Sequence, residues 1–427
     1  MTMHENKTEQ EKALLVSVDT GEFDAEASID ELEELVYTAG AEVIGKVIQK
    51  KEVPEKATFV GVGKLAEIIA FCQSNEVDLL IFDSELSPSQ QRNLEKLTNV
   101  RVIDRTMLIL DIFALRARTA EGKLQVELAQ LKYQLPRLAG QGTSLSRLGG
   151  GIGTRGPGET KLESDKRHIR RKIQKLEQEL KALEKRREQM HKRRQKDMVQ
   201  TVAIVGYTNA GKSTLMNALT DAGVLAENKL FATLDPTTRK FELPSGETVL
   251  LTDTVGFIRK LPHHLVNAFR STLDEAVCAD IIMILADASD PEYLSQLECT
   301  EQTLEELGAG EKPTLYVFNK CDRGTFDDPV IDRTKHREKV VHVSALTGEG
   351  CDKLADMLVE MINGGKARVT FKIPNSEAGA LNRLYKDATV EEVDYGAEYI
   401  TVVATVDAKT RGTLRKYDTN PPEKEEY

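Results

Sequence analysis

The chain has 427 residues, 40% of them hydrophobic, which is enough for about three domains with cores of their own. Its longest apolar runs are too short to cross a membrane, its first residues are too polar for a signal peptide, and its five cysteines lack zinc-site spacing. We therefore expect a cytoplasmic protein with reduced thiols and no membrane span.

The formal net charge of −11 is unevenly distributed along the chain. Residues 1–118 carry a net charge of −9, whereas residues 161–196 carry a net charge of +9. A basic helix on an acidic protein favours one surface that meets a polyanion. The alternative is a charged helix face that is simply solvated.

Residues 1–118 are predicted to form a small α/β domain with a mostly parallel sheet. The predicted strands are 13–18, 59–62, 78–82 and 100–103, and the predicted helices are 30–39, 64–71 and 87–97. The stretch Gly61-Val62-Gly63-Lys64 could touch a phosphate, but it lacks the full dinucleotide pattern, so a tight turn is favoured.

Residues 119–198 are predicted to form a helical hairpin. Leucines at 124, 128, 131, 135 and 138 alternate in steps of four and three, and a second stripe runs from Leu162 to Met190. Two such heptad stripes favour packing against each other as an antiparallel coiled coil. Pro136 is expected to help end the first helix.

A Gly-rich segment, Gly140–Gly158, separates these two predicted helices. Such a segment cannot pack a core; it is either a flexible tip or a loop whose backbone approaches another surface closely. Arginines in and around it are predicted to contact RNA phosphates. They are Arg137, Arg147, Arg155, Arg167, Arg170 and Arg171.

Residues 199–365 are predicted to be a P-loop domain with a mostly parallel, doubly wound sheet. Gly206-Tyr207-Thr208-Asn209-Ala210-Gly211-Lys212-Ser213 is a complete phosphate loop, placed between an apolar strand and a helix that starts near Thr214. Backbone N–H groups of such a loop bind phosphate oxygens, while Lys212 reaches the outer phosphates and Ser213 binds Mg²⁺.

Three further motifs follow this loop in order. Asp253-Thr254-Val255-Gly256 is a D-x-x-G, in which Asp253 would hold Mg²⁺ through water and the Gly256 N–H would sense the γ-phosphate. In Asn319-Lys320-Cys321-Asp322, the carboxylate of Asp322 can accept two hydrogen bonds that guanine donates and adenine does not. Ser344-Ala345-Leu346 would supply a backbone contact to the base edge. Together these motifs predict guanine nucleotide binding.

Residues 366–427 are predicted to form a small α+β module and a disordered tail. The predicted strands are 369–373, 389–393 and 399–406, the predicted helices are 376–386 and 408–416, and the tail is 420–427. The sequence does not indicate what this module contacts.

The whole set of motifs resembles the HflX family of translational GTPases. The matching strings are 155–160 (RGPGET), 231–237 (FATLDPT), 253–258 (DTVGFI) and 265–275 (LVNAFRSTLDE). The resemblance implies binding to the large ribosomal subunit, with the hairpin reaching toward the peptidyl transferase region, and a role in splitting or rescuing stalled ribosomes under stress.

By this resemblance, 231–237 (FATLDPT) is the first switch, in which Phe231, Ala232 and Thr233 are expected to approach the nucleotide. Thr233 is the predicted Mg²⁺ ligand and γ-phosphate sensor because the sequence around it is similar to that of related GTPases. Thr237 and Thr238 are the competing candidates.

The predicted catalytic groups are Lys212, Thr233, Gly256 and Asn209. Ras-like enzymes carry a water-orienting Gln directly after D-x-x-G, but this chain has Phe257, so hydrolysis should be slow alone and stimulated by a partner. Asn209 occupies the position where potassium-activated GTPases carry an Asn, so K⁺ is a second candidate cofactor beside Mg²⁺. The alternative is an Asn that stabilises its own turn.

We expect a monomer that does not bind DNA. Two other functions stay open at this stage. One is an RNA-remodelling protein with a second, ATP-binding site in residues 13–118, although no second full phosphate loop is present. The other is a binding module that GTP switches without functional turnover.

Overall fold

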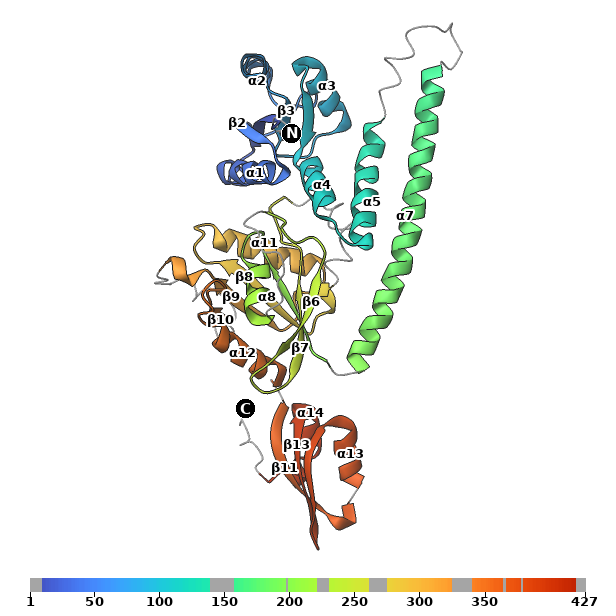
Figure 1. Cartoon of the computed structure of the whole chain (residues 1–427), viewed down its shortest axis with the longest axis vertical. Helices are drawn as coiled ribbons and strands as arrows, with labels where there is room; N and C mark the ends of the chain where they lie inside the picture. Colours follow the sequence, from blue (N-terminus) through green and yellow to red (C-terminus); the bar gives the residue numbers. More distant parts are fainter. Residues whose placement is uncertain are drawn as a thin grey trace, which may run out of the picture. The chain divides into compact units, whose positions relative to one another are not determined.

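The computed structural model describes residues 10–138, 157–196, 199–220, 230–260, 275–324, 340–363, 366–377 and 379–419. The chain packs as two compact units (Figure 1). The first comprises residues 1–241 with 249–349, and the second comprises residues 242–248 with 350–427. Within the described ranges, no helix is long and apolar enough to cross a membrane.

The N-terminal part of the first unit is built on a four-stranded parallel sheet. Its strands are β1 (Lys12–Asp19), β2 (Glu42–Lys50), β3 (Leu79–Phe82) and β4 (Arg101–Asp104), in the order β2-β1-β3-β4. Its helices are α1 (Ala25–Ala39), α2 (Val62–Asn75), α3 (Pro88–Thr98) and α4 (Arg105–Arg116). Every residue of β3 is buried, as expected for a parallel strand covered on both faces. The predicted α/β class is confirmed.

Two local predictions in this region are corrected by the structure. The predicted strand at 59–62 is wrong, because Phe59 has a φ of +65° and Gly61 is the N-cap of α2. The N–H of Gly61 donates to Oε1 of Gln49 (2.9 Å), which supports the tight turn over a phosphate loop. The first helix begins already at Ala25, because Asp24 caps it. Two elements, β2 and α4, were not predicted.

The helical hairpin is confirmed within the described residues. Helices α5 (Ala120–Arg137) and α7 (Pro157–Lys196) lie side by side and run antiparallel (Figure 1). Leu128, Ile173, Leu176 and Leu180 form their shared buried core, as the heptad pattern predicted. Pro136 lies in the last turn of α5, which ends one residue later.

The second part of the first unit is a six-stranded sheet in the order β10-β9-β8-β5-β7-β6. Its strands are β5 (Thr201–Gly206), β6 (Thr237–Glu242), β7 (Thr248–Asp253), β8 (Ile281–Asp287), β9 (Thr314–Asn319) and β10 (Val340–His342). Its described helices include α8 (Lys212–Thr220) and α11 (Tyr293–Glu306). Pairs from β7 through β5, β8 and β9 to β10 are parallel, which confirms the predicted P-loop fold. The strand β6 was not predicted.

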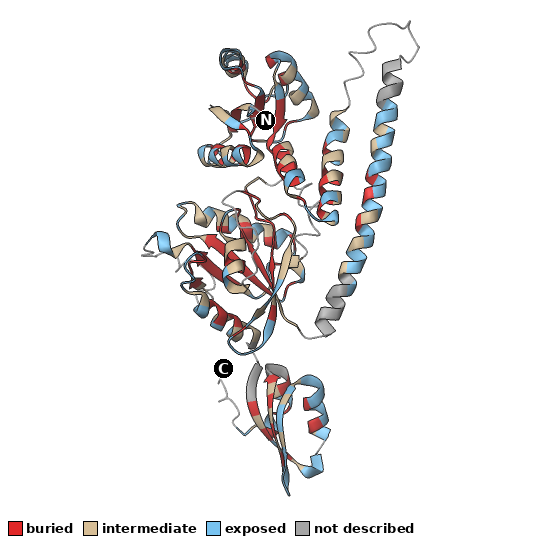
Figure 2. Ribbon diagram, in the orientation of Figure 1, coloured by how far each residue is buried: buried red, intermediate tan, exposed pale blue. Residues whose placement is uncertain are grey.

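The two sheets of the first unit share one hydrophobic core. Buried residues of α1 and α4 belong to the same cluster as Leu230, Phe231 and Leu234, which precede β6. Figure 2 shows the strands of both sheets as mostly buried. The nucleotide-binding motifs therefore lie in a fold whose core continues into the N-terminal region.

The second unit contains a three-stranded antiparallel sheet with the order β11-β13-β12. Its elements are α12 (Cys351–Asn363), β11 (Lys366–Pro374), α13 (Gly379–Asp387), β12 (Thr389–Tyr395), β13 (Tyr399–Asp407) and α14 (Ala408–Thr413). Phe371, Ile373, Val402 and Leu384 lie at the centre of its core. This agrees with the predicted α+β module. The four domain boundaries given above stay predictions.

Candidate functional site

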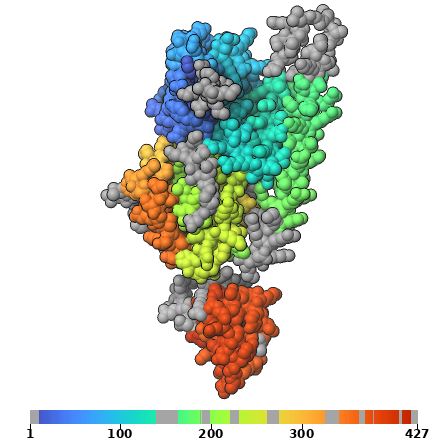
Figure 3. All heavy atoms as spheres, in the orientation of Figure 1, coloured from blue at the N-terminus to red at the C-terminus, as the bar shows by residue number. Residues whose placement is uncertain are grey.

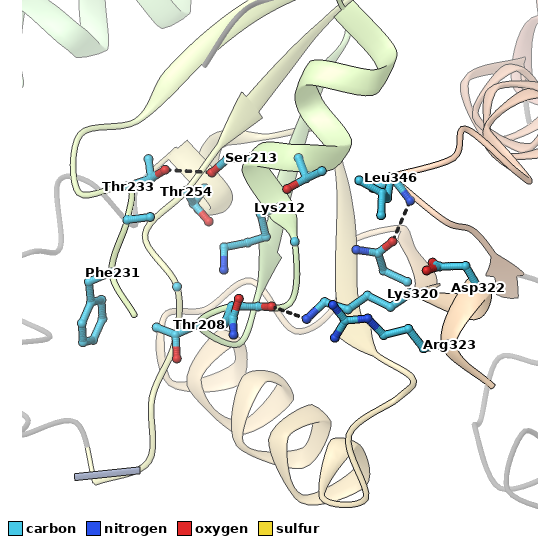
Figure 4. A pocket seen from close by; sticks show the side chains of 17 residues that line it. Thr208, Lys212, Ser213, Phe231, Thr233, Thr254, Lys320, Asp322, Arg323 and Leu346 are labelled. Carbon is cyan, nitrogen blue, oxygen red and sulfur yellow. Dashed lines mark hydrogen bonds between the residues drawn. The ribbon is translucent and has the colours of Figure 1, made fainter. Parts of the chain in front are cut away.

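The four nucleotide-binding motifs meet around one cavity of about 440 Å³ in the first unit (Figure 4). Motifs at the carboxyl ends of parallel strands meet because those ends share one edge of the sheet. The lining residues are Thr208, Asn209, Gly211, Lys212, Ser213, Thr214, Phe231, Ala232, Thr233, Thr254, Gly256, Asn319, Lys320, Asp322, Arg323, Ala345 and Leu346.

Glycines are required at both ends of the phosphate loop. Gly206 has a φ of +148°, and a Cβ there would overlap the carbonyl oxygen of Leu285. Gly211 has a φ of +96°, and a Cβ there would overlap the side-chain amide of Asn319. The loop can therefore lie against β8 and the base-recognition loop only without side chains at these two positions.

Lys212 is buried at the start of α8. Its Nζ donates to the carbonyl oxygens of Gly206 (3.1 Å) and Tyr207 (2.7 Å). Burial lowers the pKa of Lys212 to about 8, although the carboxylate of Asp253 acts in the opposite direction. A buried ammonium group of this kind is stabilised when an anion such as a phosphate lies beside it.

The predicted metal ligands lie together at the start of α8: Ser213 follows Lys212 and lies beside Thr233 (Figure 4), and Asp253 contacts Ser213. The hydroxyl of Ser213 is 2.8 Å from Oγ1 of Thr233 and donates to Oδ2 of Asp253 at 2.7 Å. Oδ1 of Asp253 is buried without a hydrogen-bond partner, and burial raises the pKa of this carboxyl. Two hydroxyls and an incompletely satisfied carboxylate are the oxygen donors that suit Mg²⁺.

The structure distinguishes the three candidate threonines of the first switch. Thr233 lines the cavity beside Ser213. Thr237 and Thr238 belong to β6, and the hydroxyl of Thr238 is 3.0 Å from that of Thr252. The geometry therefore favours Thr233 as the residue that reaches a metal ion.

Gly256 and Phe257 have different roles in the D-x-x-G loop. A Cβ on Gly256 would lie 2.8 Å from Cγ2 of Thr208 and 2.9 Å from Nζ of Lys212, so the site has no room for a side chain. The side chain of Phe257 is 1% exposed, and its backbone pairs with Gly206 and Thr208. A buried ring cannot orient a water molecule in the cavity.

The base-recognition loops are joined by side-chain hydrogen bonds. Asn319 donates to the carbonyl of Ala210 (2.8 Å) and accepts from the N–H of Ala345 (2.9 Å). Lys320, which has a φ of +64°, donates to the carbonyl of Asn209 (3.0 Å). The hydroxyl of Ser344 donates to Asp322 at 2.6 Å.

Arg323 also lines this end of the cavity, and sequence reasoning did not select it. Its side chain is exposed, and it lies beside that of Lys320 in the close-up view (Figure 4). The available signal was its position directly after the N-K-x-D motif, and that motif does not specify the following residue.

Some predicted nucleotide-binding residues support the site without lining the cavity. Gly206, Ala210, Asp253 and Ser344 act through the hydrogen bonds described above, and Val255 is buried. Tyr207 does not line the cavity, and its phenol donates to Oε2 of Glu31 in α1 (2.6 Å). Burial and the carboxylate of Glu31 raise the pKa of this phenol.

The predicted RNA contact of Arg137 needs correction. Its guanidinium donates to the carbonyl of Leu86 (2.7 Å), to the side chain of Gln91 (3.2 Å) and to Oδ2 of Asp104 (3.3 Å), and its side chain is only 13% exposed. It also covers the ring of Tyr133. These contacts attach the end of α5 to the N-terminal sheet, so we remove Arg137 from the proposed RNA contacts.

The other predicted arginines have different positions. Arg167, Arg170 and Arg171 are exposed on α7, which forms a long green surface in the space-filling view (Figure 3). Arg147 and Arg155 lie outside the described residues.

Known protein families match successive parts of this chain. The family described as "GTP-binding GTPase N-terminal" matches residues 26–114, and the family described as "GTP-binding GTPase Middle Region" matches residues 116–194. The family described as "50S ribosome-binding GTPase" matches residues 201–320, and the family described as "HflX C-terminal domain" matches residues 329–412.

Individual relatives resemble the chain over most of its length. The GTPase HflX of Lacrimispora saccharolytica is 50% identical over 96% of this chain and 97% of its own. The GTPase HflX of Escherichia coli is 46% identical over 90% of each chain. A solved structure of a GTP-binding protein from Sulfolobus solfataricus in complex with GDP is 27% identical, with a TM-score of 0.44, and the match covers 83% of this chain and 99% of that chain.

Proposed function

Since this chain belongs to the HflX family of GTPases, we propose that it acts on the large ribosomal subunit and helps to split or rescue stalled ribosomes under stress. The observation that carries this proposal is the combination of a complete nucleotide cavity with an exposed basic helix in the same compact unit. The first element provides a switch, and the second provides a surface for RNA phosphates.

For the nucleotide, we propose that Mg²⁺ is held by Ser213, Thr233 and, through water, Asp253. When bound there, Mg²⁺ supplies charge neutralisation between the outer phosphates. Lys212 would bind the same phosphates, and the Gly256 N–H would sense the γ-phosphate. The carboxylate of Asp322 would accept hydrogen bonds from guanine, and the hydroxyl of Ser344 orients it for that contact.

We propose that hydrolysis is slow without a partner. The buried ring of Phe257 occupies the place of the usual water-orienting Gln, and the described residues show no replacement base. Binding to ribosomal subunits would then arrange the site so that the attacking water is oriented. Fast turnover of the isolated protein would contradict this part of the proposal.

Asn209 carries a separate proposal about K⁺. It lines the cavity, its φ is +63°, and Lys320 holds its carbonyl, so its position in the loop is fixed. A side-chain oxygen there could hold K⁺ between the phosphates, where a positive charge assists hydrolysis. Turnover measured in K⁺ and in Na⁺ tests this, and equal rates would remove the idea.

The proposed ribosomal role predicts an effect of surface charge on α7. We expect large ribosomal subunits to stimulate GTP turnover, and the stimulation to fall as salt rises. The combined substitution Arg167→Glu, Arg170→Glu and Arg171→Glu should remove most of the stimulation, as should deletion of residues 140–158. Turnover of the triple variant without subunits should not change, because Arg167, Arg170 and Arg171 do not line the cavity.

A matched triple substitution in the second unit provides the control. Lys372→Glu, Arg383→Glu and Lys386→Glu change the same number of exposed positive charges outside the hairpin. If the unmodified protein and both triple variants all lack stimulation, the partner is not the large subunit. If both triple variants lose stimulation equally, net charge rather than α7 is responsible.

A further inference from the structure

The first switch is packed against the N-terminal region instead of lying free at the surface. Phe231 is 2% exposed and has a φ of +53°. Its ring meets the ring of Phe113 in α4 edge-on, with centroids 4.7 Å apart and an interplanar angle of 81°. Leu230 and Leu234 are buried in the same core. The switch therefore has a defined partner outside the GTPase fold.

Asp235 makes the polar part of this contact, at the start of the hairpin. Its Oδ2 accepts the backbone N–H groups of Arg118 (2.8 Å) and Thr119 (2.9 Å), and its Oδ1 accepts the hydroxyl of Thr119. That hydroxyl also caps α5 by accepting the N–H of Gly122 at 2.9 Å. A negative charge beside the N-terminus of a helix is further stabilised by the helix dipole.

The close approach explains an unfavourable residue in α5. Gly122 lies in the first turn, where glycine is a poor helix former. A Cβ on Gly122 would overlap Oδ1 of Asp235. The glycine at position 122 therefore leaves free the space that the carboxylate of Asp235 occupies.

The same short segment reaches the metal end of the nucleotide cavity. Thr233 lies two residues before Asp235, a span of at most about 7 Å of extended chain. The hydroxyl of Thr233 is 2.8 Å from that of Ser213 (Figure 4). In addition, Glu121 in the first turn of α5 binds Arg187 of α7 at 2.5 Å. One segment thus connects the cavity to both helices of the hairpin.

We infer that Asp235 is a positioning residue for GTP hydrolysis, which holds Thr233 at the metal end of the cavity by anchoring the first switch to the start of α5. The inference rests on the proposed role of Thr233 as a Mg²⁺ ligand. If Thr233 left the metal site after hydrolysis, Asp235 would be drawn away from α5, and displacement of α5 would in turn withdraw Thr233. The anchor consists of the three hydrogen bonds that the side chain of Asp235 accepts from Arg118 and Thr119.

Amide hydrogen exchange in the first turn of α5 tests the coupling directly. In the unmodified full chain with Mg²⁺, residues 120–123 should exchange more slowly with a non-hydrolysable GTP analogue than with GDP. Asp235→Ala should remove this difference and raise the Mg²⁺ concentration for half-maximal turnover at least about tenfold, since three hydrogen bonds to a carboxylate are lost. Asp235→Asn keeps a carbonyl acceptor for both amides and should restore most of the difference.

Two controls separate this inference from the proposed function. Asp24→Ala removes a carboxylate that caps α1 through two amides, and among the described residues no hydrogen bond joins it to the first switch, so it should change neither readout. Thr233→Ala should raise the Mg²⁺ requirement; if it does not, the assigned ligand is wrong. If Thr233→Ala has its effect while Asp235→Ala leaves both readouts unchanged, the positioning role is wrong. Faster exchange throughout β1–β4 would show that Asp235→Ala is misfolded, and Thr119→Val, which removes the hydroxyl that donates to Asp235, then decides. A weaker nucleotide dependence together with a raised Mg²⁺ requirement in Thr119→Val upholds the role, and an unchanged dependence with an unchanged Mg²⁺ requirement overturns it.

Discussion

Asp83 is a fully buried carboxylate at the contact between the N-terminal sheet and the loop after the D-x-x-G motif. It accepts hydrogen bonds from Ser17, Ser28 and Arg105, and it pairs with Lys260. We expect Asp83→Ala to lower the free energy of unfolding by about 3 kcal/mol, because Arg105 stays buried and loses one of its carboxylate partners. Urea denaturation measures this change.

An exposed ion pair offers the comparison for Asp83→Ala. Lys51 and Glu55 lie 2.6 Å apart, with side chains 33% and 47% exposed. Lys51→Ala should lower the free energy of unfolding by less than about 1 kcal/mol, since solvent screens such pairs. Equal effects of the two substitutions would mean that burial of Asp83 does not strengthen its interactions.

Asp111 in α4 should make stability depend on pH. Burial raises the pKa of this carboxyl above its ordinary value of 3.8, against the nearby charge of Arg101. The folded state then holds a proton that the unfolded state has released, so stability falls as pH rises from 3.8 through the raised pKa. The side chain of Asp111→Asn is neutral at every pH, so the melting temperature of this variant should exceed that of the unmodified protein at pH 7 and match it near pH 3.

At the scale of elements, the first turn of α5 has an unusual requirement for glycine. Replacing a helical glycine by alanine usually stabilises a protein by up to about 1 kcal/mol. Gly122→Ala should instead lower the melting temperature, because its Cβ would overlap the carboxylate of Asp235. The matched control is Gly63→Ala in α2, where a Cβ meets nothing within 4 Å and the substitution should stabilise.

The contact between α5 and α7 depends on a small apolar core. Leu176 is 5% exposed and packs with Leu128 and Ile173. Leu176→Ala should cost about 2–5 kcal/mol of local stability, seen as faster amide exchange in α7 with little change in β1–β4. The neighbouring exposed residue Lys175 gives the control, because Lys175→Ala removes no buried group. Uniform acceleration throughout the first unit would show that the hairpin does not open separately.

Several elements and site residues could be predicted because local patterns determine them. The phosphate loop, the base-recognition motif and the heptad stripes are readable from spacing alone, and the structure places each on its expected element. The partners of Arg137, Tyr207 and Asp235 could not be predicted. Tyr207 meets Glu31, and Asp235 meets Thr119, across separations of 176 and 116 residues. No local pattern reports such contacts, so the sequence indicates only the motif to which each of these residues belongs.

For the whole molecule, the main consequence of the fold is the core shared by the two sheets of the first unit. A fragment lacking residues 1–198 would expose Leu230, Phe231 and Leu234, each contributing roughly 1.5–3 kcal/mol when buried. We expect this fragment to melt at a lower temperature than the full chain and to bind a dye that reports exposed apolar surface. An unchanged melting temperature without dye binding would mean that the GTPase sheet is stable on its own.

The two attachments of α5 have a mechanical consequence. Arg137 fastens one end of this helix to Asp104, and Thr119 fastens the other end to Asp235. A rod fixed at both ends transmits a load along its length instead of swinging about one end. A force on α7 would therefore act on two attachments of α5, those at Arg137 and at Thr119. Only the attachment at Thr119 lies near the nucleotide cavity. Release of Asp235 from Thr119 would therefore leave α5 attached only through Arg137.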